Sequence, residues 1–162
     1  MPSLYERFVG GVMIITSLGW AKRRTCYCAE PISACAALGS AGHGSRVLIA
    51  DGNYPFTTGS PPSAQVVYLN LRPGLVSVSD VLETLVAVLP IESTMVMVPP
   101  DGPEPEIHAA MRAMLPPGVP MVRKGRFEFY EEARSPDTAL VVATGEQRIY
   151  ANILIVIGVV AP

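Results

Sequence analysis

Two groups that can exchange protons flank one short apolar run. His43 lies between Gly42 and Gly44, and Asp51 follows residues 46–50, which read Arg-Val-Leu-Ile-Ala. An imidazole gives and takes protons near neutral pH, and a carboxylate can be its partner in general acid–base catalysis. We therefore expect a histidine on a glycine turn and an aspartate at a strand end to face one pocket and to act on a small ligand.

A second group of polar side chains lies near the C-terminus. Arg126 and Tyr130 are four residues apart, so on a helix they share a face. Tyr150 and Asn152 alternate with Ala151, so in an extended segment they point the same way. One guanidinium, two phenol hydroxyls and one amide together offer many hydrogen bonds. This set predicts a polyhydroxylated ligand, which presents many oxygens and no fixed charge.

Familiar motifs of nucleotide binding and hydrolysis are missing from the sequence. The Gly42-His43-Gly44 segment has Val47 where a dinucleotide loop has its third glycine, and it precedes a strand instead of following one. There is no phosphate-binding loop, serine-hydrolase elbow or zinc-protease signature. Structural interpretations also exist for single residues: His43 as a helix cap, Asp51 as a turn cap, His108 as a surface histidine, and Tyr54 as a residue that closes a loop over the core.

The composition predicts a globular domain that binds neither nucleic acid nor metal. Lys and Arg number 12 against 14 Asp and Glu, and 49% of the residues are hydrophobic. A mean hydropathy of +0.35 is high for a small monomer, so we expect sister subunits to cover part of the surface. The basic cluster Arg123-Lys124-Gly125-Arg126 is interpreted as a solvated turn. Cys26, Cys28 and Cys35 lack metal-ligand spacing and are interpreted as reduced cytosolic thiols.

The first 28 residues are interpreted as an extension outside a core domain of residues 29–162. Their apolar run, residues 8–20, is too short for a membrane-spanning helix, which needs about 17–25 residues. A basic cluster at residues 22–24 follows the run instead of preceding it, unlike a secretory signal. The extension can be a packing arm, an interfacial segment, or sequence upstream of the true start.

From Pro31 onward the hydropathy pattern alternates between strand and helix. Such alternation predicts a single-domain, layered α/β sheet with flanking helices. Asp51 ends a predicted strand, where ligands of α/β sheets tend to bind. We expect strands over 46–50, 65–71, 94–98 and 139–143, and one long strand or a pair of strands over 152–160. We also expect a surface loop over 52–63 and helices over 33–40, 78–89 (capped by Ser77 or Ser79), 105–115 and 127–133.

Several motifs together resemble the L-fucose mutarotase / D-ribose pyranase family. They occur in the family order between residues 31 and 160, and the separation of His43 and Asp51 agrees as well. The motifs are Gly42-His43-Gly44, Ala50-Asp51-Gly52-Asn53-Tyr54-Pro55, Arg126-Phe127-Glu128-Phe129-Tyr130-Glu131, and Ala143-Thr144-Gly145-Glu146 followed by Tyr150-Ala151-Asn152.

This resemblance implies a small cytoplasmic α/β protein that interconverts the anomers or ring forms of a monosaccharide without metal or cofactor. It also implies a homo-oligomer, from a dimer to a decameric ring, with sites near subunit boundaries. We expect no nucleic-acid partner and no stable membrane insertion. His43 matches the family's proton donor. The family's sugar-contacting positions are matched by Asp51, Arg126, Tyr130, Tyr150 and Asn152.

The implied chemistry needs only proton transfer. Opening a pyranose requires a proton at the ring oxygen and removal of one from the anomeric hydroxyl; the aldehyde then rotates and the ring closes on its other face. A histidine acid contributes on the order of 10²–10⁴-fold to such a step. Asp51, Tyr150 and water are all candidates for the base.

Three departures from the family pattern limit what the resemblance implies for this chain. Pro73, in Leu71-Arg72-Pro73-Gly74, stands where fucose-type members have a sugar-contacting aspartate. Extra residues surround Ser135-Pro136, and Arg126 is fucose-type whereas Tyr150-Ala151-Asn152 is closer to the ribose type. The leading hypothesis is a mutarotase for L-fucose or a similar aldose. The alternatives are a ribose-type pyranase, a sugar-binding or transport-associated accessory protein, and an oligomeric scaffold.

Overall fold

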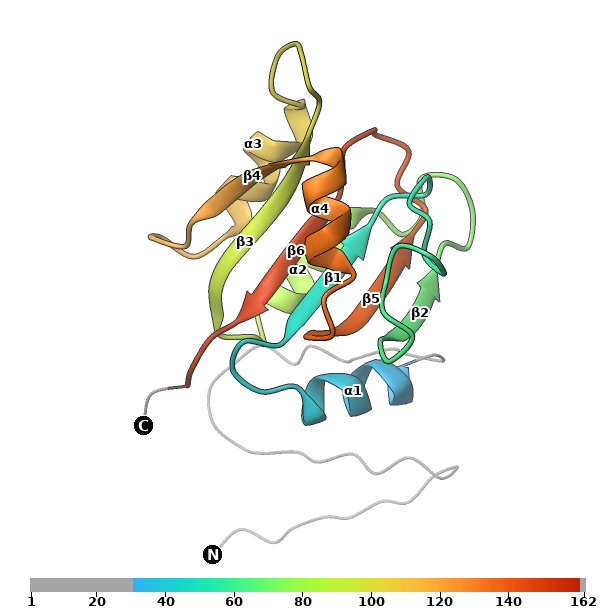
Figure 1. Ribbon diagram of the computed structural model, residues 1–162, viewed down its shortest axis with the longest axis vertical. Helices are drawn as coiled ribbons and strands as arrows, with labels where there is room; N and C mark the ends of the chain where they lie inside the picture. The colour runs from blue at the N-terminus through green and yellow to red at the C-terminus, as the bar shows by residue number, and fades with distance from the viewer. Residues whose placement is uncertain (1–30, 161–162) are drawn as a thin grey trace, which may run out of the picture.

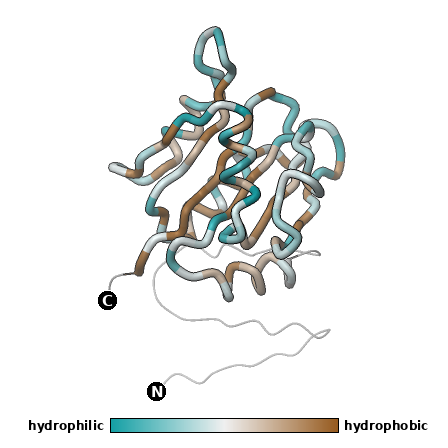
Figure 2. Tube along the Cα trace, viewed as in Figure 1, coloured by the Kyte–Doolittle hydropathy of each residue, from teal (hydrophilic) through white to brown (hydrophobic). Residues whose placement is uncertain are grey.

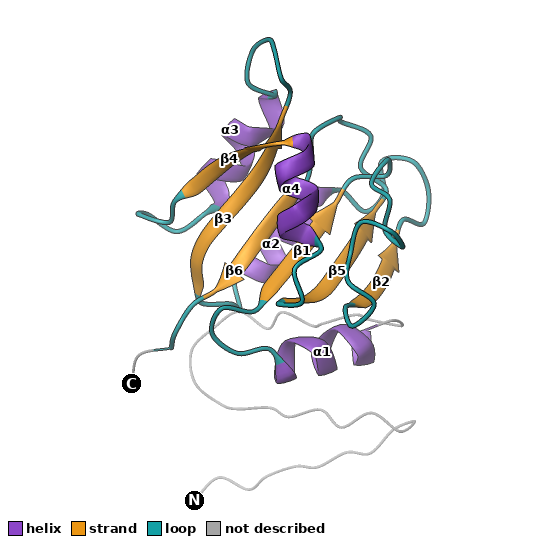
Figure 3. Ribbon diagram, viewed as in Figure 1, coloured by secondary structure: helices purple, strands orange, loops and turns teal. Residues whose placement is uncertain are grey.

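The structure, a computed structural model, describes residues 31–160. The predicted extension of residues 1–28, with Cys26 and Cys28, lies outside the described residues. Within residues 31–160 no helix is both long and apolar enough to cross a bilayer. The described chain is an α/β fold, as predicted, with one six-stranded sheet and helices on both faces (Figures 1 and 3).

The elements follow the hydropathy pattern closely. Each predicted strand and helix is present, and most boundaries move by only one to three residues. The helices are α1 (Pro31–Ser40), α2 (Val78–Val86), α3 (Glu106–Met114) and α4 (Arg126–Ala133). The strands are β1 (Arg46–Ala50), β2 (Gln65–Leu69), β3 (Ile91–Val98), β4 (Met121–Gly125), β5 (Thr138–Thr144) and β6 (Ile153–Ile157).

The strand directions bring many chain segments to one edge of the sheet. The order is β2-β5-β1-β6-β3-β4, and only β6 runs antiparallel to its two neighbours, β1 and β3. Because β6 is reversed, its first residue lies beside the last residues of the other strands. We call this side, where all strands except β6 end, the carboxyl edge, and the opposite side, where they begin, the amino edge. These two edges are rows of strand ends and not the outermost strands of the sheet.

Alternation along the strands divides the core into two layers. Val47 and Ile49 of β1 pack with α1, α2 and α3 on one face of the sheet. Leu48 and Ala50 point to the other face and pack with Phe129 of α4. Figure 1 shows α4 crossing one face and α2 lying behind the sheet, and in Figure 2 the central strands are the most hydrophobic segments.

The prediction of a solvated turn at Arg123-Lys124-Gly125-Arg126 is wrong. Residues 121–125 form β4, and Arg126 begins α4 directly after it. β4 is a short edge strand, and charged side chains on such an edge discourage pairing with another chain. Lys124 pairs with Glu132 at 2.9 Å and Arg123 pairs with Glu104 at 2.6 Å, so both cations are engaged. Because these side chains are charged, the hydropathy pattern of residues 121–125 does not indicate a strand.

Candidate functional site

A pocket at the carboxyl edge contains all the residues predicted to bind the ligand. Its volume is about 280 Å³, and it opens over the ends of β1, β3 and β4 and the start of β6. We call it the Asp51 pocket. The predicted residues that line it are Asp51, Arg126, Tyr130, Tyr150 and Asn152.

Asp51 and Asn152 form the floor of this pocket through a reciprocal pair of hydrogen bonds. The side-chain amide of Asn152 donates to Asp51 Oδ2 at 2.8 Å, and the Asp51 backbone N–H donates to Asn152 Oδ1 at 2.9 Å. The Asn53 N–H donates to Asp51 Oδ1 at 3.0 Å. Both side chains are buried. The amide orientation of Asn152 and the position of the carboxylate are therefore fixed before any ligand binds.

Burial makes the Asp51 carboxyl a stronger base than an exposed aspartate. Desolvation raises its pKa, and the hydrogen bonds from Asn53, Asn152 and Ala151 offset part of that rise. A carboxylate with a raised pKa accepts a proton more readily, which suits general base catalysis. The pocket thus holds one carboxylate whose burial favours its protonated form.

Tyr150 enters the pocket from an unusual backbone conformation. Its φ is +61°, in the left-handed region that L-residues other than glycine rarely occupy. Its carbonyl accepts a hydrogen bond of 3.1 Å from Nε2 of His108. The prediction that His108 is a surface histidine is wrong, because its side chain is completely buried on α3. The adjacent alanines and acidic residues of α3 gave no sign of that contact.

Arg126 and Tyr130 approach the pocket from the first turns of α4. The guanidinium of Arg126 stacks on the exposed ring of Phe127 at 5.1 Å, and no carboxylate in residues 31–160 forms an ion pair with it. Tyr130 lies edge-on against Tyr54 at 5.5 Å. Tyr54 is buried and donates to the carbonyl of Gly59 at 2.6 Å, so it closes the 52–63 loop over the core as predicted.

His43 lies at the other edge of the sheet. It precedes β1, whereas Asp51 follows β1, so in one chain the two are separated by the length of the strand, on the order of 20 Å. The His43 side chain is 60% exposed, and its Nε2 donates to the carboxylate of Glu92 at 2.7 Å. The structure of one chain therefore does not bring His43 into the Asp51 pocket.

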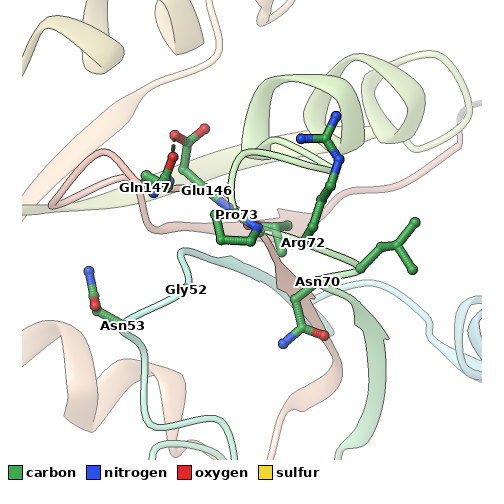
Figure 4. Close-up of a pocket in the computed structure, with 10 residues that line it drawn as sticks. Gly52, Asn53, Asn70, Arg72, Pro73, Glu146 and Gln147 are labelled. Atoms are coloured by element: carbon green, nitrogen blue, oxygen red, sulfur yellow. Dashed lines mark hydrogen bonds between the residues drawn. The ribbon is translucent and has the colours of Figure 1, made fainter.

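A second pocket adjoins the first at Asn53 and has a volume of about 490 Å³. It lies over the ends of β2 and β5, and we call it the Pro73 pocket. In Figure 4 Pro73 lies between Asn70 and Glu146, while Arg72 extends away from Asn53. The position that carries an aspartate in fucose-type members therefore contributes only an apolar ring to this wall.

Glu146 is a buried carboxylate that the sequence analysis named only as part of a family motif, without a role of its own. Its carboxylate accepts two hydrogen bonds from the guanidinium of Arg148, at 2.9 and 2.6 Å, and one from the Arg148 backbone N–H at 3.1 Å. It also accepts the N–H of Val78 at the start of α2. These bonds lower the pKa of Glu146 to about 2. Its position after the β5 strand, next to a glycine, was the available signal. Among the described residues, no three His, Cys, Asp or Glu side chains are placed to hold a metal ion.

Comparison with known proteins places this fold among sugar-related structures. The sequence profile of the RbsD / FucU transport protein family matches residues 32–160. The structure of Bacillus subtilis RbsD complexed with D-ribose has a TM-score of 0.69 and 22% identity, covering 87% of this chain and 100% of that one. At that identity the likeness shows the fold.

Two further structures are somewhat more similar in sequence. The fucose mutarotase from Streptococcus pneumoniae in complex with L-fucose has 26% identity and a TM-score of 0.64, covering 78% of this chain and 91% of that one. FucU from Bifidobacterium longum has 28% identity and a TM-score of 0.66, covering 82% and 96%. The predicted family resemblance is thus confirmed.

Proposed function

Because the chain belongs to the RbsD / FucU transport protein family, we propose that it is a monosaccharide mutarotase. It interconverts the α and β anomers, or the ring forms, of an aldose, and L-fucose or a related sugar is the proposed substrate. The observation that carries this proposal is the Asp51 pocket, in which Asp51, Arg126, Tyr130, Tyr150 and Asn152 meet.

The pocket suits a small neutral polyol. Its volume of about 280 Å³ lies near the lower limit for ligand pockets, which range from about 300 to 1,000 Å³. The unpaired guanidinium of Arg126 and the phenols of Tyr130 and Tyr150 can donate to sugar oxygens. The buried Asp51–Asn152 pair supplies fixed acceptors and a donor. This combination fixes the orientation of a sugar ring without requiring a charged group on it.

Asp51 is the proposed proton acceptor. Burial raises the pKa of its carboxyl, so this carboxylate takes the proton of the anomeric hydroxyl more readily than an exposed aspartate would. As the anomeric hydroxyl loses its proton, the bond between the anomeric carbon and the ring oxygen breaks, and the ring oxygen takes up a proton. The open-chain aldehyde can then rotate before the ring closes again.

His43 is the proposed acid, and a second copy of the chain supplies it. The exposed imidazole at the amino edge of one copy can meet the open mouth of the Asp51 pocket of another, because homo-oligomers place different edges of the same fold in contact. Ile149, 66% exposed, lines that mouth, and Phe127, 71% exposed, contacts Arg126 of the same lining, so both offer apolar surface to the neighbouring copy. The proposed enzyme is therefore a homo-oligomer with shared sites.

D-Ribose is the second candidate substrate. The Tyr150-Ala151-Asn152 segment resembles the sequence motif of ribose-type members. Pro73 replaces the aspartate with which fucose-type members contact their sugar. Loss of that contact also favours a protein that binds a sugar and catalyses little or no exchange. Both alternatives are outcomes of the same measurement.

The test is saturation-transfer NMR of L-fucose, D-ribose and related aldoses with the full chain. We expect faster exchange between the anomers of at least one sugar, and a loss on the order of 10²–10⁴-fold in His43→Ala. Tyr150→Phe removes one hydroxyl from the pocket and is expected to reduce exchange about tenfold.

Tyr68→Phe is the matched control, because Tyr68 is an exposed tyrosine of β2 outside both pockets. It should exchange sugars at the rate of the unmodified protein. Ligand-induced shifts without faster exchange would replace the enzyme with a binding protein. No response to any sugar would leave only the scaffold hypothesis.

A further inference from the structure

His108 is a completely buried imidazole that the proposed proton transfers do not use. It lies on α3, and its only hydrogen bond among the described residues joins Nε2 to the carbonyl of Tyr150 at 3.1 Å. Its Nδ1 is 3.7 Å from Oε1 of Glu104, which is too long for a hydrogen bond. Since a carbonyl only accepts, Nε2 is the donor of this hydrogen bond.

The same peptide unit lies between His108 and Asp51. The carbonyl of the unit between Tyr150 and Ala151 accepts from His108, and the N–H of this unit lowers the pKa of the Asp51 carboxyl against the larger effect of burial. Both partners are buried. One peptide plane is therefore fixed between α3, which packs behind the sheet, and the floor of the Asp51 pocket.

This fixed peptide determines where the Tyr150 side chain points. With φ at +61°, Tyr150 occupies a conformation that its own side chain disfavours, so surrounding contacts must impose it. The bond from His108 is the contact made by the Tyr150 carbonyl itself. A different φ would rotate the phenol away from its place in the lining of the pocket.

We propose that His108 is a positioning residue that holds the Tyr150–Ala151 peptide, and thereby the Tyr150 phenol and the Ala151 N–H, in the geometry that a sugar requires. It touches no substrate and acts through Tyr150 and Asp51. This inference rests on the proposed function for its kinetic readout, and it has a second readout that does not depend on activity.

The first experiment compares His108→Leu, His108→Gln and His108→Asn in the full chain. The amide nitrogen of glutamine can occupy the place of Nε2, whereas that of asparagine is shorter and reaches only the place of Nδ1. We expect kcat/KM for the aldose to fall about ten- to a hundredfold in the Leu and Asn variants and to recover in the Gln variant.

A double-mutant cycle separates positioning from general damage. If His108 acts through the phenol, the loss caused by His108→Leu must be much smaller in a Tyr150→Phe background than in the unmodified chain. Met111→Leu, at a buried position of the same helix, controls for changed packing of α3 and should keep full activity. Equal losses in both backgrounds would overturn the inference.

Amide hydrogen exchange gives the readout that is independent of any substrate. The Ala151 N–H should exchange about tenfold faster in His108→Leu and His108→Asn, and at the original rate in His108→Gln and Met111→Leu. If no aldose responds to the unmodified protein, the proposed function fails while this measurement still decides the role of His108. Unchanged exchange in all four variants would refute that role.

Discussion

Single residues show how far the sequence specified this site. The types and spacings of Asp51, Tyr150 and Asn152 indicated a polyol pocket, because local patterns reveal which side chains share a face. Those patterns did not reveal the bonds between Asp51 and Asn152, which are 101 positions apart. The contact of His108 with Tyr150 spans 42 positions and was also missed. Contacts between distant segments depend on the tertiary fold and leave no periodic signal.

Glu146 gives a prediction about pH. The pKa of its carboxyl falls from 4.5 to about 2, and the largest cause is the hydrogen bonding from the Arg148 side chain. The folded state therefore favours the ionised form. A group whose pKa is lowered in the folded state stabilises the protein fully at pH values above its pKa in the unfolded state. That stabilisation is lost as the pH falls through its pKa in the folded state. We expect Glu146→Gln to reduce the free energy of unfolding by about 1–3 kcal/mol at neutral pH.

The difference in the free energy of unfolding between Glu146→Gln and the unmodified chain should shrink as the pH is lowered from about 4.5 to about 2. Urea unfolding at a fixed protein concentration and several pH values measures it. Glu83→Gln, at an exposed position of α2, is the matched control and should not change the free energy of unfolding. A difference between Glu146→Gln and the unmodified chain that stays constant down to pH 2 would contradict this account.

At the scale of elements, the sequence predicted the parts with a clear apolar pattern. The strands β1 and β5 were found as short continuous apolar runs, and the helix α2 was found because its apolar residues repeat at helix spacing. β4 was missed because an edge strand has exposed charged residues where a central strand has apolar ones. The strand order and the antiparallel direction of β6 depend on long-range pairing, which short segments do not encode.

Gly145, at the end of β5, gives a prediction about the turn after β2. A Cβ atom on Gly145 would collide with the carbonyl oxygen of Arg72 and lie 2.6 Å from that of Leu75. Gly145 also donates to Val76 and accepts from Gly74, so this turn is fixed tightly against β5. Gly145→Ala should reduce the free energy of unfolding by about 1–3 kcal/mol.

Gly39→Ala is the control for Gly145→Ala, because a Cβ on Gly39 of α1 meets nothing within 4 Å. That variant should be as stable as the unmodified chain or slightly more stable, since alanine favours a helix. Thermal or urea unfolding measures both. Equal stabilities of the two variants would show that the backbone around residues 72–75 yields easily.

The whole molecule separates its proposed acid from its proposed base. His43 at the amino edge and Asp51 at the carboxyl edge lie too far apart to contact one sugar within one chain, so the proposed catalytic site needs two copies. If a second copy completes the site, a mixture of two inactive variants should regain activity. A variant His43→Ala has an intact pocket, and a variant Arg126→Ala has an intact imidazole.

Random assembly of equal amounts of these two variants should restore about a quarter of the sites, because each site needs its pocket from one variant and its histidine from the other. The measurement is saturation-transfer NMR after the two proteins are unfolded and refolded together. Each variant refolded alone is the control. Light scattering must find an oligomer, and a strict monomer or an inactive mixture would exclude shared sites.

The reversed strand in the middle of the sheet has a consequence for biosynthesis. β6 is the last strand to leave the ribosome among those described, yet it joins β1 to β3. Until it arrives, β2, β5 and β1 form one half-sheet and β3 and β4 form another, each with an unpaired apolar border. A nascent chain therefore closes its interior only after β6 has been made, and until then each border can pair with the border of another chain.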